Sequence, residues 1–198
     1  PDNDTMLCYP VMWTPPTMAN PQLDWFHKYV VEQVVESDPS GGAPSRETDY
    51  TYTNPAWHYD SDNVISPAAD KTWSVWRGFG HVTTTTGNDQ TTRTKTVTTY
   101  YQGMDGDKQS SGPARSATVT DSNGTHVTDH DQLAGSVRES RTFNGTAEVG
   151  STITDWWIHQ TATDGTRTAD YVRQSAVHTR TDRTSGTPRT TTVTTAYD

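Results

Sequence analysis

The clearest strand pattern in the chain lies in residues 72–87. From position 73 to position 81, the odd-numbered residues form one alternating set and the intervening residues form another. A period of two places these sets on opposite faces of a strand. Gly78 and Gly80 leave one face bare beside Phe79, and glycine inside a strand usually marks a bulge, a bend or a close backbone approach. The pattern predicts a long, bent strand with aromatic rings on its buried side.

Turn signals recur along the rest of the chain, and no segment keeps a helical period over 12 residues. The Asn-Gly pair within residues 122–124 is the strongest short hairpin signal, because both central residues of such a turn adopt positive φ. We therefore expect an all-β fold, with antiparallel hairpins forming a curved sheet strip. The further strands are predicted over residues 28–36, 46–53, 91–101, 114–121, 125–128, 135–143, 149–161, 166–182 and 187–197.

Two segments frame this prediction. Residues 1–27 are rich in proline, which removes a backbone donor and fixes φ, so they are predicted to be an irregular lead-in. Residues 28–36 fit a helical period, but their β-branched side chains favour a strand. We expect residues 28–198 to be a single β-hairpin unit within a longer chain, and residues 54–71 to be a loop.

Composition and charge narrow the class of protein. Hydrophobic residues make up 30% of the 198 residues, yet there are seven tryptophans. This combination predicts a thin, sheet-rich object with a local aromatic core. The net charge of −9 argues against nucleic-acid binding and against adsorption to anionic membranes. Cys8 is the single cysteine, so no internal disulfide is possible, and no apolar run approaches the ~20 residues of a membrane helix.

The first candidate for chemistry is a run of histidines and aspartates. His126, Asp129, His130 and Asp131 are nitrogen and oxygen ligands of the kind that metals use. In a strand, however, residues four apart lie about 13 Å apart, so one metal reaches both histidines only across a turn. Aspartates also favour turns. We expect a structural role, with a metal-dependent hydrolase as the alternative.

A second candidate resembles part of a calcium loop. Asp60, Asp62 and Asn63 follow His58 and Tyr59. The glycine at the sharp turn and the distal glutamate of a calcium loop are missing, so we expect a surface loop.

A third candidate is the pair of carboxylates at Asp105 and Asp107. A glycosidase needs two acids matched across a cleft, which the sequence alone does not supply. A G-x-S-x-G nucleophile elbow is absent from the sequence. We expect no enzyme activity and no cofactor.

The tryptophans allow two interpretations. Exposed rings on a sheet stack on sugars, whereas buried rings supply core area of about 150–250 Å² each. We expect most of them to be core. The alternative function is a secreted carbohydrate-binding module in which Trp57 and Trp76 stack on a glycan.

Several motifs, in order, resemble RHS/YD-repeat proteins of the actinobacterial type, and the shell region of Tc toxin B components and SpvB-like proteins. The central motif is Trp76-Arg77-Gly78-Phe79-Gly80, and a YD-type strand end occurs at Tyr197-Asp198. The similarity covers most of the chain. Its other parts are residues 8–10, 13–16, 24–31, 50–52, 57–60, 103–107 and 119–122.

This resemblance implies a segment of a hollow β-strand shell that encapsulates a C-terminal toxin or effector. The expected partners are flanking segments of the same polypeptide and the encapsulated effector. The implied location is secreted or cell-surface. Both ends of the sequence look like cuts within a longer chain, and an isolated piece of shell would have raw edges. We therefore expect residues 1–198 alone to be poorly soluble or oligomeric.

Overall fold

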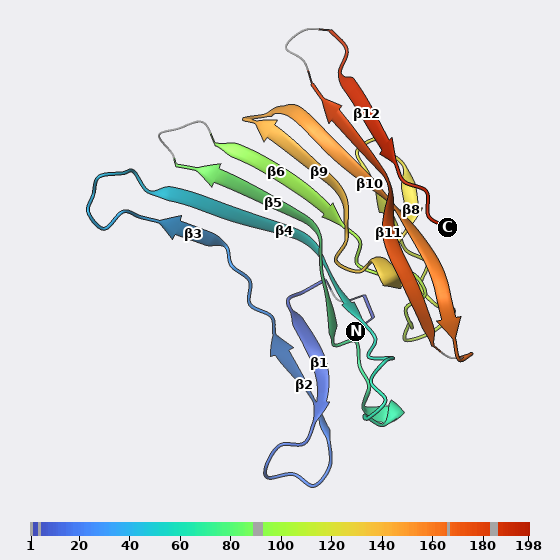
Figure 1. Ribbon diagram of the computed structural model, residues 1–198. Helices are drawn as coiled ribbons and strands as arrows, with labels where there is room; N and C mark the ends of the chain where they lie inside the picture. The colour runs from blue at the N-terminus through green and yellow to red at the C-terminus, as the bar shows by residue number, and fades with distance from the viewer. Residues whose placement is uncertain (1, 4, 89–92, 166, 183–185) are drawn as a thin grey trace.

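The computed structural model describes residues 2–3, 5–88, 93–165, 167–182 and 186–198 (Figure 1). The described residues contain strands and two short 3₁₀ turns, η1 (Ala68–Asp70) and η2 (Asp131–Leu133), and no α-helix. The all-β prediction is confirmed. In chain order the strands are β1 (Cys8–Trp13), β2 (Gln22–His27), β3 (Gln33–Glu36), β4 (Arg46–His58), β5 (Val75–Gly87), β6 (Thr94–Tyr100), β7 (Thr118–Thr120), β8 (His126–Thr128), β9 (Val137–Asn144), β10 (Ala147–Thr163), β11 (Thr168–Thr181) and β12 (Arg189–Thr194).

Eight of these strands form one curved, open sheet in the order β12-β11-β10-β9-β6-β5-β4-β3 (Figure 1). Every neighbouring pair is antiparallel. Strands β1 and β2 form a separate hairpin, and β7 and β8 form another. The edges of the large sheet are therefore β3 on one side and β12 on the other.

The glycine-bearing strand β5 is bent by a bulge, as predicted. Phe79 pairs with Pro55 and Trp76 pairs with Trp57, so β5 carries one extra residue between these pairs. Gly78 has a φ of 80° in this interval, a conformation that glycine adopts without a Cβ clash. Gln102 lies in the segment after β6. Its side-chain amide donates to the backbone oxygen of Gly78, 2.9 Å away, and so holds the bulge in place.

The Pro-rich lead-in differs from the predicted irregular coil, because it contains a two-stranded hairpin. Six residue pairs join β1 to β2, with Pro10 opposite Trp25. Proline is accepted because each strand of a two-stranded sheet is an edge strand, with one row of backbone groups outside the ladder. The Thr72 hydroxyl donates to the Pro10 oxygen at 2.6 Å, and the Lys28 amide donates to the Leu7 oxygen, also at 2.6 Å. The first bond ties the hairpin to the segment before β5, and the second extends the hairpin's own ladder by one residue pair beyond Cys8–His27.

Some predicted boundaries move. Strand β3 begins at Gln33, and residues 28–32 precede it outside any strand. Strand β4 continues to His58, so the first five residues of the predicted 54–71 loop belong to the sheet. The Ser-Asn-Gly hairpin forms, but Gly124 has positive φ and Asn123 does not, so the two-residue turn with two positive φ values was the wrong turn type. The tips predicted at residues 87–90 and 184–186 lie partly outside the described residues.

Most buried side chains lie toward the strand ends that are lowest in Figure 1. There the long 101–136 connection between β6 and β9 covers the sheet. Tyr101, Val119 and Leu133 form the buried apolar cluster, with Trp156 and Ile158 of β10 packed against it. A second cluster consists of aromatic rings around Trp57 of β4, where the Tyr9 and Trp76 rings pack against it. At the opposite end of the strands, Phe143 of β9 is buried under the Lys95 and Arg141 side chains, and both edge strands are exposed, so the core consists of separate local clusters.

Candidate functional site

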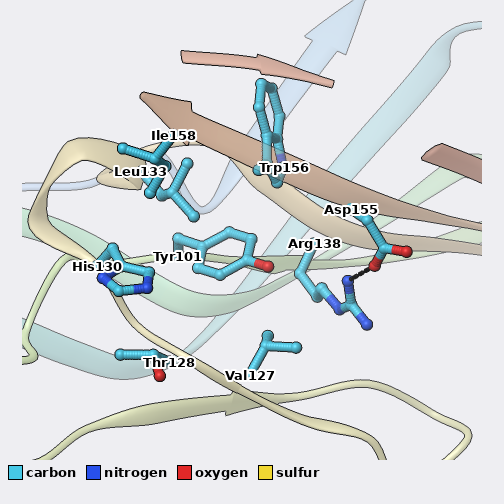
Figure 2. Close-up of a pocket in the computed structure, with 9 residues that line it drawn as sticks. All are labelled: Tyr101, Val127, Thr128, His130, Leu133, Arg138, Asp155, Trp156 and Ile158. Atoms are coloured by element: carbon cyan, nitrogen blue, oxygen red, sulfur yellow. Dashed lines mark hydrogen bonds and ion pairs between the residues drawn. The ribbon is translucent and has the colours of Figure 1, made fainter. Parts of the chain in front are cut away.

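The histidines and acids between residues 105 and 131 lie in the 101–136 connection, and one of them, His130, lines the cavity beneath it. Figure 2 shows this cavity, of about 420 Å³, between hairpin β7–β8 and strand β10. Its lining mixes apolar side chains with a few polar groups. The lining residues are Tyr101, Val127, Thr128, His130, Leu133, Arg138, Asp155, Trp156 and Ile158.

Arg138 is the central charge of this region. Its side chain is almost fully buried, and its guanidinium pairs with Asp155 and with Asp121, the latter at 2.6 Å. It also donates to the Thr154 backbone oxygen at 3.0 Å. A guanidinium with these three partners is not a free site for an anionic ligand. The arrangement therefore joins the turn of hairpin β7–β8 to strands β9 and β10.

These pairings set the ionisation of the groups involved. Burial alone would lower the pKa of Arg138, but the hydrogen bonds to Asp155 and Asp121 raise it overall. Burial would likewise raise the pKa of Asp121 and of Asp155, yet the bonds from Arg138 hold both pKa values below the usual range. Burial raises the pKa of the neighbouring Tyr101 phenol. The carboxylates are thus held charged, and the phenol is held neutral.

Asp129 is buried, and its backbone hydrogen bonds give it a structural role. Its two carboxylate oxygens accept backbone hydrogen bonds from Gln102, Gly103 and Met104 at 2.8–3.0 Å. The three amides lie at the start of the 101–136 connection and Asp129 lies near its end, so this carboxylate holds the two ends of the connection together. Its neighbour Asp131 forms an ion pair with Arg77 of β5 at 2.6 Å.

The structure does not bring the two histidines of the predicted metal site together. His126 lies in β8, where its Nδ1 atom is 2.8 Å from the Thr120 hydroxyl of β7. His130 lies at the cavity beside η2. No group of three or more metal-ligating side chains occurs among the described residues. The contacts of Asp129 support a structural role, but its carboxylate binds amides 25–27 residues away rather than amides of its own turn.

Asp107 forms a second buried polar centre. Its carboxylate accepts a hydrogen bond from the Tyr59 amide at 3.0 Å and lies 3.3 Å from His58 Nε2. The other imidazole nitrogen of His58 is 2.7 Å from the Tyr59 backbone oxygen. Asp105 accepts from the Ala117 amide at 2.9 Å. The two carboxylates that we considered as a glycosidase pair therefore hold two different backbone segments, Asp107 the residue after β4 and Asp105 the residue before β7.

The segment after β4 is partly core, which corrects the predicted surface loop. His58 and Tyr59 are buried. Beyond them the loop prediction holds: the Asn63 amide donates to Asp60 at 2.9 Å, and its oxygen accepts from the amide of Ser66. This is the geometry of a side-chain-stabilised turn.

The tryptophans proposed for glycan stacking differ in exposure. Trp57 is 3% exposed, with the Tyr9 ring stacked on it at 4.5 Å and the Trp76 ring at 4.7 Å. Trp57 therefore presents no open face to a sugar, and this part of the prediction was wrong. Trp76 is half-buried against Phe79, and the Lys28 ammonium lies over its ring.

The remaining motif residues have structural contacts. Gly80 lies close to Asn54 and Gln102, and a Cβ there would be 3.2 Å from the Asn54 Cβ. The Tyr197 ring stacks on Trp157 of β10, and its hydroxyl donates to the Gln174 backbone oxygen. Asp198 is exposed.

Arg138 and Glu139 are adjacent and both buried, and neither was expected to be so from the sequence. Glu139 accepts hydrogen bonds from the amide and hydroxyl of Ser122. Adjacent strand residues point to opposite faces, so their burial means that both faces of β9 are covered here. Charged residues usually mark a solvated face, and nothing else in this segment signals burial.

Comparison with family models, with curated proteins and with solved structures found no match. Within the described residues, no helix has the length and apolar character needed to cross a membrane.

Proposed function

We propose that this chain is a structural segment of an RHS-type β-strand shell that walls off a C-terminal toxin or effector domain. The observation that carries the proposal is the exposure of both edge strands of the eight-stranded sheet: every residue of β3 and of β12 is exposed. A sheet edge presents unpaired N–H and C=O groups, which are a template for another strand. In the proposal, flanking segments of the same polypeptide complete both edges.

Apolar side chains at the β3 edge support this proposal. Tyr29 is 88% exposed, and Val31 and Val35 are each more than half exposed. Val30 and Val34 add to the same border. Apolar residues gathered at an open edge mark an interaction surface rather than a solvated margin. A neighbouring strand and the side chains beside it would cover them.

The sheet itself suits a thin wall. Threonine occupies long stretches of β5 and β6, where Thr84 pairs with Thr96 and Thr86 with Thr94. Cross-strand threonine pairs stabilise a sheet while leaving hydroxyls for water. A wall needs this combination on surfaces that a second layer does not cover.

The proposed role requires no catalytic residue in this segment. The buried acids that we considered for chemistry, Asp107 and Asp129, hold backbone amides. Secretion or cell-surface display belongs to the proposal as well, and the family resemblance supports it.

Limited proteolysis tests the encapsulation. The substrate is the natural polypeptide that contains residues 1–198, compared with the same polypeptide lacking residues 28–198. We expect the region downstream of residue 198 to resist a broad-specificity protease in the first protein and to be cut rapidly in the second. Equal cleavage of that region in both proteins would overturn the proposal.

A further inference from the structure

The two edges of the sheet have compatible directions. Each neighbouring pair in the eight-stranded sheet is antiparallel, so β3 runs opposite to β12. A second copy in the same orientation, placed beside the first, brings its β3 next to the first copy's β12 in antiparallel alignment. The alternation of strands then continues without interruption across the junction.

The two edges also agree in their faces. Residues that pair directly in neighbouring strands lie on the same face of the sheet. Following these pairs from β12 to β3 places Thr192 and Val35 on the same face. Val193 and Val34 therefore share the opposite face. The directly paired residues that carry the first face across the sheet are Thr192, His178, Ile153, Glu139, Thr99, His81 and Thr53, and Asp49 and Gln33 lie on it further along β4 and β3.

One register matches both the apolar and the charged side chains. With Val193 opposite Val34, two exposed valines cover one another across the junction. Arg189 then lies diagonal to Glu36, the last residue of β3, within reach of the long Arg189 side chain, and Asp38 lies just beyond the strand in the turn that follows it. Asp38 is held charged, because hydrogen bonds from the Ser40 side chain and amide lower its pKa. The β3 border thus carries carboxylates where the β12 border carries a guanidinium.

We propose that a second copy of this chain pairs its β3 edge with the β12 edge of the first, head to tail, with Val34 opposite Val193. Such a contact uses two different surfaces, so it builds a ring if the rotation between copies closes and an open filament if it does not. The inference rests on the proposed function in one respect, that both edges accept strands; it concerns residues 1–198 alone, where another copy takes the place that flanking polypeptide takes in the natural chain.

Cysteine cross-linking tests the register. Two variants, each carrying Cys8→Ser, have Val34→Cys or Val193→Cys, and both sites are exposed. We expect mild oxidation of the equimolar mixture to give a disulfide-linked dimer of the two variants, because opposite residues have Cβ atoms about 4.5–5.5 Å apart. The matched control replaces Val34→Cys by Val35→Cys, which lies on the other face and should cross-link at least tenfold less to Val193→Cys. Efficient cross-linking of either variant to itself, or equal yields with the control, would overturn the proposal.

Light scattering gives a second measurement without cysteine at the edge. We expect the apparent mass of the Cys8→Ser chain to rise above 21.9 kDa with concentration. Val193→Lys places a charge at the junction and should raise the concentration needed for association at least tenfold. Val64→Lys is the control at an exposed loop residue and should leave association unchanged. A monomer at every concentration, or equal effects of the two lysines, would contradict the pairing while leaving the protease test of the shell unaffected.

Discussion

Arg138 Nη2 lies 2.6 Å from Asp121 Oδ2, and the side chains of both residues are almost completely removed from solvent, at 4% and 1% exposure. The pair connects strand β9 to the turn of hairpin β7–β8. The Asp121 carboxylate also accepts hydrogen bonds from the amides of Asn123 and Thr125, which set the turn itself. Together with the hydrogen bonds from Ser122 to Glu139, this ion pair holds the hairpin over the sheet.

Arg138→Met should therefore be strongly destabilising. The substitution keeps an apolar stem but leaves the buried Asp121 carboxylate without its counter-charge. Breaking a buried pair in this way costs about 3–5 kcal/mol of unfolding free energy. Arg46→Met is the matched control, because the Arg46–Glu36 pair is 3.9 Å apart and exposed, and it should cost about 0–1 kcal/mol. Urea unfolding measures both, and equal losses would show that the Arg138 pair is not the connection that we describe.

The same ion pairs make the fold sensitive to acid. Asp121 and Asp155 have pKa values below the usual range in the folded state. The stability that they contribute is complete above the ordinary aspartate pKa of about 3.9 and is lost as the pH falls through the lower folded-state values. The unfolding midpoint of the wild-type chain should fall with acidification over this window. Asp121→Asn should flatten that fall, and an unchanged acid dependence in the variant would count against the assignment.

Gly103 is predicted to be the least replaceable glycine of the connection. A Cβ there would lie 2.9 Å from the Asp131 Cα and 3.0 Å from the Ala134 Cβ, and its φ is 69°. Gly106 has a φ of 84° but open space around it. Gly106→Ala should thus cost about 1–2 kcal/mol through its backbone conformation alone. Gly103→Ala should cost about 1–3 kcal/mol more, from overpacking. Similar melting temperatures for the two variants would refute the close contact.

Trp57 should behave as a core residue. Trp57→Ala removes a ring packed between Tyr9 and Trp76, and should cost about 3–5 kcal/mol in chemical unfolding. Trp25, which is nearly half exposed, is the control, and Trp25→Ala should cost roughly half as much or less. If Trp57→Ala kept full stability but lost binding on a glycan array, the carbohydrate-binding alternative would replace the structural one.

The hairpin architecture was predictable from local signals. The alternation of residues 72–87 and the glycine at position 78 correctly indicated a strand and its bulge, because both depend on period and backbone freedom alone. The Asp-Pro-Ser-Gly turn before β4 was equally local, since Asp38 accepts hydrogen bonds from its own turn.

The structural roles of the buried charged residues could not be predicted from such local signals. Arg138 is buried because residues 17 positions away on both sides, Asp121 and Asp155, meet it in space. The β1–β2 hairpin was missed for a related reason. Pro10 normally argues against a strand, and its position in a two-stranded sheet is a tertiary fact.

The central claim is that strands from flanking polypeptide complete the β3 and β12 edges. Amide hydrogen exchange tests it most directly, comparing residues 1–198 at a dilution where they are monomeric with the natural polypeptide that contains them. The account predicts that amides on the outer sides of β3 and β12 exchange rapidly in the isolated chain and at least a hundredfold more slowly in the natural polypeptide. Rapid exchange of both edges in the two proteins alike would contradict it.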